Sequence, residues 1–167
     1  MKQAIAGVAP PREGETTIMV VWPTIAENAA GRLIGRLCGT GSGSSSFFTL
    51  GKLYALLSIP AALALFFWGL APWICKRYRL TNRRLIVERG LSGTSEKWVR
   101  LEDFDAIDIE VLRGQEWHHA GEMIFRKGAT ETFRISGVRR PEVFKQTCLK
   151  AHQAYTSVER ILALQSA

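Results

Sequence analysis

The residues best suited to chemistry in this chain include a histidine pair beside a glutamate. His118 and His119 follow Glu116, and imidazole and carboxylate groups can ligate a metal or transfer protons. Adjacent histidines on a strand or loop point in different directions, however, and no second pair in the sequence supplies further ligands. We therefore expect a structural or solvent-exposed role for these histidines, with no metal site and no cofactor.

Acidic residues form a second candidate group. Paired, buried carboxylates are needed for acid–base catalysis, whereas alternation along a strand places neighbours on opposite faces. The pattern favours a solvated strand over a catalytic pair. The acidic positions are Asp103, Asp105, Asp108 and Glu110.

Serine chemistry is the third candidate. Ser92, Ser95 and His152 have the residue types of a nucleophile and its base, but neither serine lies in a G-x-S-x-G turn. Nothing in the sequence orients the histidine. We expect no catalytic residues and no enzymatic activity.

Length, net charge and cysteine content limit the classes of protein to which the chain can belong. With 167 residues the chain has room for one ordinary domain and an appendage, and its net charge of +7 suits either nucleic acid or an anionic membrane surface. Cys38, Cys75 and Cys148 are far apart and lack a C-x-x-C spacing, which predicts free thiols in a reducing compartment.

The most apolar segment predicts a membrane span. Residues 53–74 carry no charged side chain, and a helix of this length covers about 33 Å, enough for a hydrocarbon core of roughly 30 Å. Pro60 should kink this helix. Aromatic residues near its two ends are expected to anchor it at the membrane interface: Tyr54, Trp68 and Trp73.

Flanking charge predicts the orientation. Basic residues concentrate after the span, so the positive-inside rule places the C-terminal part in the cytoplasm, as a single-pass protein of the inner membrane with the N-terminal tail outside. In an alternative, the kinked segment dips into the membrane and returns, with both ends cytoplasmic. We expect the basic residues to face the membrane surface: Lys76, Arg77, Arg79, Arg83, Arg84 and Arg89.

The N-terminal third divides into three segments. Residues 1–23 form a tail with a short β-prone run at 16–22, residues 24–38 an amphipathic helix, and residues 39–49 a Gly/Ser-rich linker. The helix fits either the membrane interface or the surface of the domain. Its apolar stripe is Ile25, Ala29, Leu33 and Leu37, and its charged residues are Glu27, Arg32 and Arg36.

Residues 76–167 predict a small antiparallel β domain. Alternating apolar residues on both sides of Thr81 and Asn82 indicate a hairpin, because Asn tolerates positive φ, and further strands follow at 96–101, 104–111, 122–128 and 131–137. From Pro141 the period changes to that of a helix. The expected fold is α+β: a transmembrane helix, then a β-sandwich or partial barrel of six to seven strands capped by a C-terminal helix. The stripe of that helix is Phe144, Cys148, Ala151, Tyr155, Val158 and Leu162.

Four segments in order carry a family resemblance: YRLTNRRLIVERG, VRLEDFDAIDIEV, GEMIF and RISGVRRPEVFKQTC. Together they resemble the bacterial membrane-flanked pleckstrin-homology-like (PH-like) family, in which a hydrophobic segment leads straight into Y-x-L-T-x-x-R. The resemblance covers residues 78–151, the span and the lead-in GETTIMVVWPT. Many relatives carry a two-helix hairpin with both ends inside. Here the polar, glycine-rich residues 26–46 stand in place of the first helix.

Three function classes follow. The resemblance implies self-association, so we expect a non-catalytic interaction and assembly module whose partners are the bilayer, further copies as a homo-oligomer and other proteins that it scaffolds. The alternative is a module that binds anionic lipid headgroups through the basic residues after the span. A nucleic-acid binder fits least, because Trp98 and Trp117 are not interleaved with a basic stripe, and we expect no nucleic-acid partner.

Overall fold

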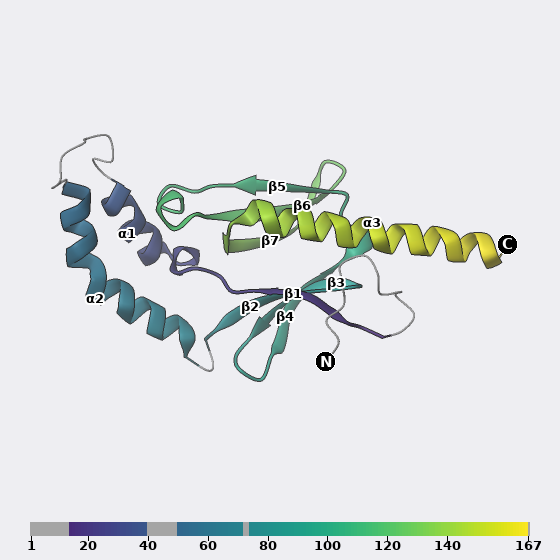
Figure 1. Ribbon diagram of the computed structural model, residues 1–167, viewed down its shortest axis with the longest axis horizontal. Coiled ribbons are helices and arrows are strands. Elements are labelled where there is room, and N and C mark those ends of the chain that lie inside the picture. Colours follow the sequence, from purple (N-terminus) through teal and green to yellow (C-terminus); the bar gives the residue numbers. More distant parts are fainter. Residues whose placement is uncertain (1–13, 40–49, 72–73, 167) are drawn as a thin grey trace.

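The computed structural model describes residues 14–39, 50–71 and 74–166. Two antiparallel sheets lie against a long C-terminal helix, and two further helices, α1 and α2, stand at one end of the sheets (Figure 1). The described strands do not close into a barrel. The α+β expectation is confirmed.

The first sheet has the strand order β1-β2-β3-β4, which is also the order in the chain. Three of its strands follow the apolar helix directly: β2 (Lys76–Thr81), β3 (Arg84–Arg89) and β4 (Thr94–Arg100). The fourth, β1 (Thr17–Val21), comes from the N-terminal segment and pairs antiparallel with β2. The β-prone run of the sequence is therefore an edge strand of the domain.

The second sheet contains β5 (Ala106–Glu110), β6 (Ala120–Lys127) and β7 (Thr130–Arg139). A bridge between Pro23 and Val138 connects the two sheets, and Thr24 donates its backbone N–H to the carbonyl of Gly137 over 2.8 Å. The residues that follow β1 thus attach the N-terminal segment to both sheets.

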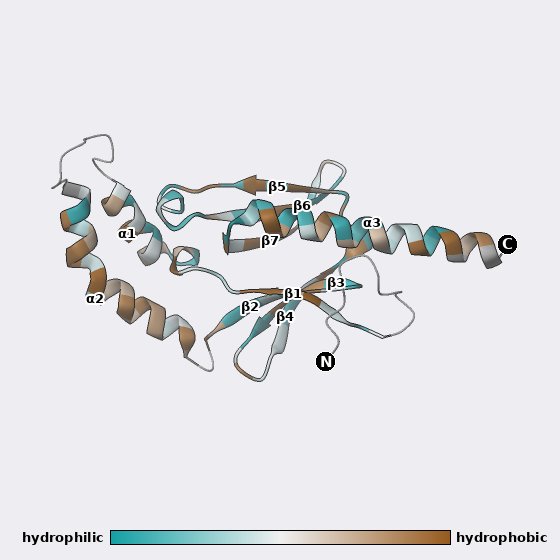
Figure 2. Ribbon diagram, in the orientation of Figure 1, coloured by the Kyte–Doolittle hydropathy of each residue, from teal (hydrophilic) through white to brown (hydrophobic). Residues whose placement is uncertain are grey.

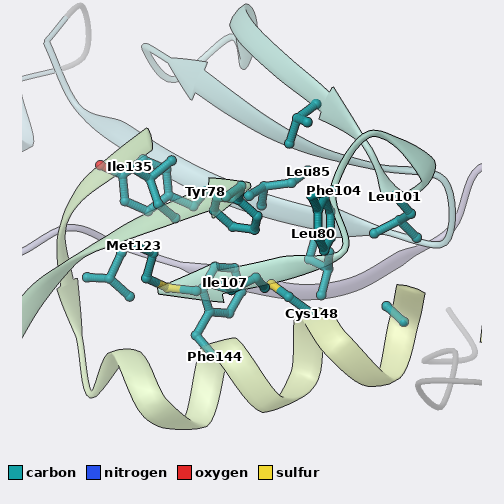
Figure 3. Packing of buried hydrophobic residues seen from close by; sticks show 14 of the residues in the cluster. Tyr78, Leu80, Leu85, Leu101, Phe104, Ile107, Met123, Ile135, Phe144 and Cys148 are labelled. Carbon is teal, nitrogen blue, oxygen red and sulfur yellow. The ribbon is translucent and has the colours of Figure 1, made fainter. Parts of the chain in front are cut away.

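The core lies between the sheets and α3 (Pro141–Ser166) (Figure 3). Phe104 and Phe125 pack edge to face with ring centroids 5.0 Å apart, and Phe144 and Cys148 enter from the helix. Burial raises the pKa of the Cys148 thiol well above its usual range. The hydroxyl of the buried Tyr78 donates to the carbonyl of Ser136 over 2.7 Å, so this polar group is satisfied.

The β2–β3 turn is held by side chains. Thr81 Oγ1 accepts the backbone N–H of Arg84, which closes the turn. Asn82 does not have positive φ, contrary to expectation; its amide instead binds the backbone at both Gly14 and Thr16. This buried side chain docks the start of the N-terminal segment onto the hairpin.

The N-terminal helices lie outside this core. A 3-10 turn, η2 (Ile25–Glu27), leads into α1 (Ala29–Gly39), which packs beside α2 (Leu50–Leu70). Figure 2 shows that apolar residues run along α2, whereas α1 is mixed. The third helix, α3, runs along the sheets and extends beyond them at the end away from α1 and α2 (Figure 1).

Candidate membrane-facing site

Helix α2 exposes apolar side chains over most of its surface, outside the face that meets α1. It has 21 residues and is the one helix of the described residues long and apolar enough to cross a membrane, and none of its most apolar stretch is buried. Leu57, Phe67 and Trp68 are each about two-thirds exposed, at 66%, 64% and 67%. A helix that is apolar all round needs an apolar environment. Of the expected interface anchors, Tyr54 and Trp68 lie on α2, and Trp73 lies outside the described residues.

The structure does not bring the expected membrane-surface residues together. Lys76 begins β2 and lies opposite Arg89, so both are at the end of the sheet from which α2 departs. Arg83 and Arg84 follow the far end of β2, about 17 Å along the strand. The basic residues therefore occupy two ends of one hairpin.

Carboxylates pair with several of these basic residues. Lys76 Nζ lies 2.5 Å from Glu27 Oε1, and Arg77 and Arg79 both contact Glu88, whose side chain is 2% exposed. Glu15 accepts two bonds of 2.8 Å from the Arg84 guanidinium. These contacts partly neutralise the charge that was expected to face anionic headgroups. The acidic partners are distant in sequence or on the next strand, and hydropathy patterns do not reveal them.

Helix α1 turns its glycines toward the domain. A Cβ added to Gly35 would lie 2.0 Å from the carbonyl oxygen of Gly114, so the two backbones touch. Leu33 and Leu37, from the expected apolar stripe, are exposed at 55% and 40%. On its other side α1 meets α2, where Cys38 Sγ lies 3.8 Å from Ser58 Oγ. The amphipathic stripe therefore does not form the contact with the sheets.

The pairing of β1 with β2 constrains how the chain meets a membrane. Val21 lies opposite Tyr78 in a hydrogen-bonded ladder, so both strands lie on the same side of any bilayer. The chain between them must cross either not at all or an even number of times. A single crossing by α2 would separate the two strands. The expectation of an N-terminal tail outside is therefore wrong for residues 14–21.

Comparison with known protein families gives a match over most of the chain. A model described as "Bacterial PH domain" matches residues 45–154, which include α2, six of the seven strands and the packed half of α3. The chain belongs to the bacterial PH domain family. No match was found among curated proteins or among solved structures.

In this bacterial PH domain, the histidines and serines that were considered as metal ligands or catalytic groups lie apart from one another. His118 Nε2 lies 3.2 Å from the Gly31 carbonyl, and His119 ends the 3-10 turn η4 (Glu116–His118) in a left-handed conformation. His152 Nδ1 lies 2.6 Å from the Leu101 carbonyl, whereas Ser92 approaches Thr94. His118, His152 and Ser92 each take part in a separate contact, and the described structure does not bring these groups together.

The acidic run of the bacterial PH domain is divided in the same way. Asp108 pairs at 2.7 Å with Arg126 on the neighbouring strand β6, and Glu110 pairs at 3.2 Å with Arg134 on β7, which lies beyond β6 in the sheet. Asp105 caps the β6–β7 turn by accepting the backbone N–H of Gly128. Cross-strand pairs of this kind stabilise a sheet.

Sequence reasoning missed the contact between α1 and the β5–β6 connection of this bacterial PH domain. Gly35 touches the backbone of this connection at Gly114, and Gly31, four residues earlier, is buried against the Ile25 carbonyl of the preceding turn. Small residues at this spacing allow backbones to approach closely, so the G-x-x-x-G pattern was the available signal.

Proposed function

We propose that this chain is a non-catalytic, membrane-attached PH-like module that assembles with copies of itself and scaffolds partner proteins at the cytoplasmic face of the inner membrane. PH-like domains are generally non-catalytic, which supports an interaction role. Two features of the structure support the assembly and the attachment separately.

The observation that carries self-assembly is the free end of α3. Its first half buries Phe144, Cys148 and Ala151 in the core. The helix has 26 residues and extends past the sheets (Figure 1), and there Ile161 and Leu164 are exposed at 55% and 75%. The apolar character of the helix thus continues beyond the core that it covers.

A second copy suits this surface. Two identical helices can pack their apolar faces around a two-fold axis, so each copy would cover the exposed end of the other. Because the packed half already holds α3 in place, pairing of the projecting half requires no rearrangement of the domain.

Substitution of the projecting apolar residues tests assembly. Ile161→Glu with Leu164→Glu should shift the purified full chain in nonionic detergent to a smaller mass in light scattering, because burying two carboxylates in a helix pair is unfavourable. Gln153→Glu, at an exposed position on the packed half, is the control and should leave the mass unchanged. A monomeric wild-type chain, or an unchanged mass for the double variant, would contradict this interface.

For membrane attachment we propose that α2 enters the membrane from the cytoplasmic face and lies along it, without crossing. The strand pairing requires zero or two crossings. Helix α1 has 11 residues, about 17 Å, against a hydrocarbon core of roughly 30 Å, so α1 is too short to supply a second crossing. It also carries Arg32 and Arg36, which are costly within a bilayer.

Cysteine labelling in intact cells tests this attachment. A membrane-impermeant thiol reagent would be applied to Val20→Cys, Ser44→Cys and Thr130→Cys variants, before and after permeabilisation. The native cysteines are all buried, and they serve as an internal background. We expect the reagent to label all three new positions only after permeabilisation, and none of them in intact cells.

Two other patterns would be decisive. Labelling of Ser44→Cys alone in intact cells would mean two crossings and would overturn the in-plane arrangement. Different accessibility of Val20→Cys and Thr130→Cys would mean that β1 and the second sheet lie on opposite faces, which contradicts the fold itself.

A further inference from the structure

An open groove lies between α1 and the β5–β6 connection. It has a volume of about 720 Å³, and its charged and aromatic lining residues are Arg36, Arg113, Glu116, Trp117 and His119. Arg36 comes from α1, whereas the others come from the segment between β5 and β6. The groove is therefore a junction between the N-terminal helices and the PH domain.

Backbone contacts fix the walls of this groove. Gly114 has a φ of +93°, and a Cβ there would lie 2.0 Å from the Arg32 carbonyl oxygen, so a larger residue would force the walls apart. Arg36 Nε donates to the Arg113 carbonyl over 3.1 Å. The buried Gln115 side chain accepts the Leu112 backbone N–H at 3.0 Å and so holds the β5–β6 connection in shape. The arginines are thus carried on a preformed frame.

Charge in the groove differs from charge on the sheets. On the sheets, basic side chains meet carboxylates, as Arg126 meets Asp108 and Arg134 meets Glu122. Within the described ranges, neither Arg36 nor Arg113 has a carboxylate within 4.0 Å. Glu116 supplies one opposing charge, and the groove remains basic.

We propose that this groove binds the phosphate group of an anionic phospholipid headgroup. Guanidinium groups recognise phosphate through paired charge-assisted hydrogen bonds, and two arginines here flank one groove. Helix α1 carries the groove on one side and contacts α2 on the other, so the apolar helix places a bilayer next to the arginines. Trp117, 46% exposed at the groove, has the amphipathic ring typical of the membrane interface.

The headgroup site is separate from the assembly surface and from the basic residues of the β2–β3 hairpin. It does not depend on self-association, because α3 contributes no lining residue. Its failure would leave the proposed assembly intact, and the reverse also holds.

Calorimetric titration of the purified full chain in a neutral detergent tests the site. The probes are dihexanoyl phosphatidylglycerol, dihexanoyl phosphatidylcholine and inorganic phosphate. We expect saturable binding of phosphatidylglycerol that weakens with added salt, at least tenfold weaker binding of phosphatidylcholine, and at least tenfold weaker binding of phosphatidylglycerol to Arg36→Gln with Arg113→Gln. Lys150→Gln with Arg160→Gln removes the same charge from exposed positions on α3 and should stay within twofold of wild type.

Arg113→Gln alone guards against loss of folding. It keeps the backbone carbonyl that accepts from Arg36, so the groove wall stays in place while one guanidinium is lost. Reduced affinity of this variant with an unchanged unfolding midpoint supports the site. Equal affinity of wild type and both groove variants overturns it. Inorganic phosphate bound as tightly as phosphatidylglycerol would mean a free-phosphate site and would overturn the lipid assignment.

Discussion

Two regions of the molecule place their apolar side chains in opposite environments. One region is formed by the two sheets and α3, and the other by the N-terminal helices α1 and α2. In the sheet region, Leu80, Leu85 and Phe125 are fully buried, and polar groups such as the Tyr78 hydroxyl find partners. In the helix pair, apolar side chains face outward, and the contact with the sheets runs through the backbones of Gly35 and Gly114. One region completes its own core, whereas the other leaves its apolar surface uncovered.

Because of this difference, one region determines the folding stability of the protein and the other its attachment to a membrane or partner. Buried apolar area stabilises the sheet region relative to the unfolded chain. The exposed area of α2 contributes nothing in water and becomes favourable only in a membrane or against another protein. Substitutions of the same chemical kind should therefore change the free energy of unfolding in one region and membrane affinity in the other.

Truncation of one phenylalanine in each region should show the difference between the two regions most clearly. Phe125 is fully buried and packs against Phe104 and Phe133, so Phe125→Ala should cost about 3–5 kcal/mol of unfolding free energy. Phe67 on α2 is 64% exposed, so Phe67→Ala should leave unfolding unchanged and reduce retention on membranes. Urea unfolding in nonionic detergent, followed by near-ultraviolet circular dichroism, measures the first effect, and vesicle flotation the second.

Phe125→Leu provides a milder variant if the alanine form does not fold, and it should lie between wild type and Phe125→Ala. An equal loss of unfolding free energy for Phe67→Ala would show that α2 belongs to the core of the domain, and the distinction between the two regions would fail.

Removal of the buried carboxylate tests the charged part of the sheet region. Glu88 is 2% exposed and contacts both Arg77 and Arg79, so Glu88→Gln leaves two guanidinium groups without their shared anion. Because both arginines reach solvent in part, we expect a loss of about 1–3 kcal/mol in urea unfolding.

Glu131→Gln is the matched exposed control. Glu131 pairs with Arg134 at the surface, and Arg134 keeps its contacts with Glu110 and Glu122 when that partner is lost. The unfolding free energy of this control should therefore equal that of wild type within experimental error. If both variants were equally stable, the Glu88 contacts would be no stronger than surface pairs.

The glycine contact offers a test at the boundary between the regions. Gly35→Ala places a methyl group against the Gly114 carbonyl and should weaken docking of α1 by about 1–3 kcal/mol. The thiol of Cys38, buried at 4% exposure, should then react tenfold faster or more with a maleimide in native conditions. Gly39→Ala meets nothing within 4 Å and should leave that rate unchanged.

Cys148 supplies an internal reference in the same experiment. It is fully buried in the core, and burial raises the pKa of its thiol, so the reactive thiolate is disfavoured. Mass spectrometry distinguishes the two sites. Accelerated labelling at Cys148 as well would indicate global destabilisation, which would remove the distinction between α1 and the sheets.

Much of the fold of the C-terminal region was predictable because its signals are local. Alternation at Tyr78 and Leu80 identifies a strand with one buried face, and the change of period at Pro141 identifies the helix. The family resemblance in the same residues is confirmed by the match to bacterial PH domains. The membership of β1 in the sheet depended on pairing with a strand some sixty residues away, which local patterns do not specify.

The candidate site was less predictable because it depends on contacts distant in sequence. The basic residues after the span were recognised, but their carboxylate partners Glu15 and Glu27 lie in the N-terminal segment. The inward face of α1 is made of glycines, which give no hydropathy signal. Arg36 and Arg113 are 77 positions apart, and the structure alone shows that they share a groove.

The smallest expected effect concerns the ion pair that attaches the N-terminal segment to the β2–β3 hairpin. Hydrogen bonds from the Arg84 guanidinium hold the pKa of Glu15 below its ordinary value of 4.5, although burial opposes this shift. A depressed carboxyl pKa stabilises the fold above 4.5, and this contribution is lost as pH falls through the folded-state value.

Unfolding of wild type and Glu15→Gln at several pH values isolates that contribution. Because the pair is solvent-exposed, we expect a difference below about 1 kcal/mol, constant from pH 7 to about pH 5 and declining toward pH 3. The comparison between variants cancels the titration of other carboxyls such as Glu131. A difference that persisted undiminished at pH 3 would mean that hydrogen bonding by the uncharged side chain, rather than the ion pair, attaches β1 to the hairpin. The N-terminal segment would then be linked to the sheets through contacts that acid does not weaken.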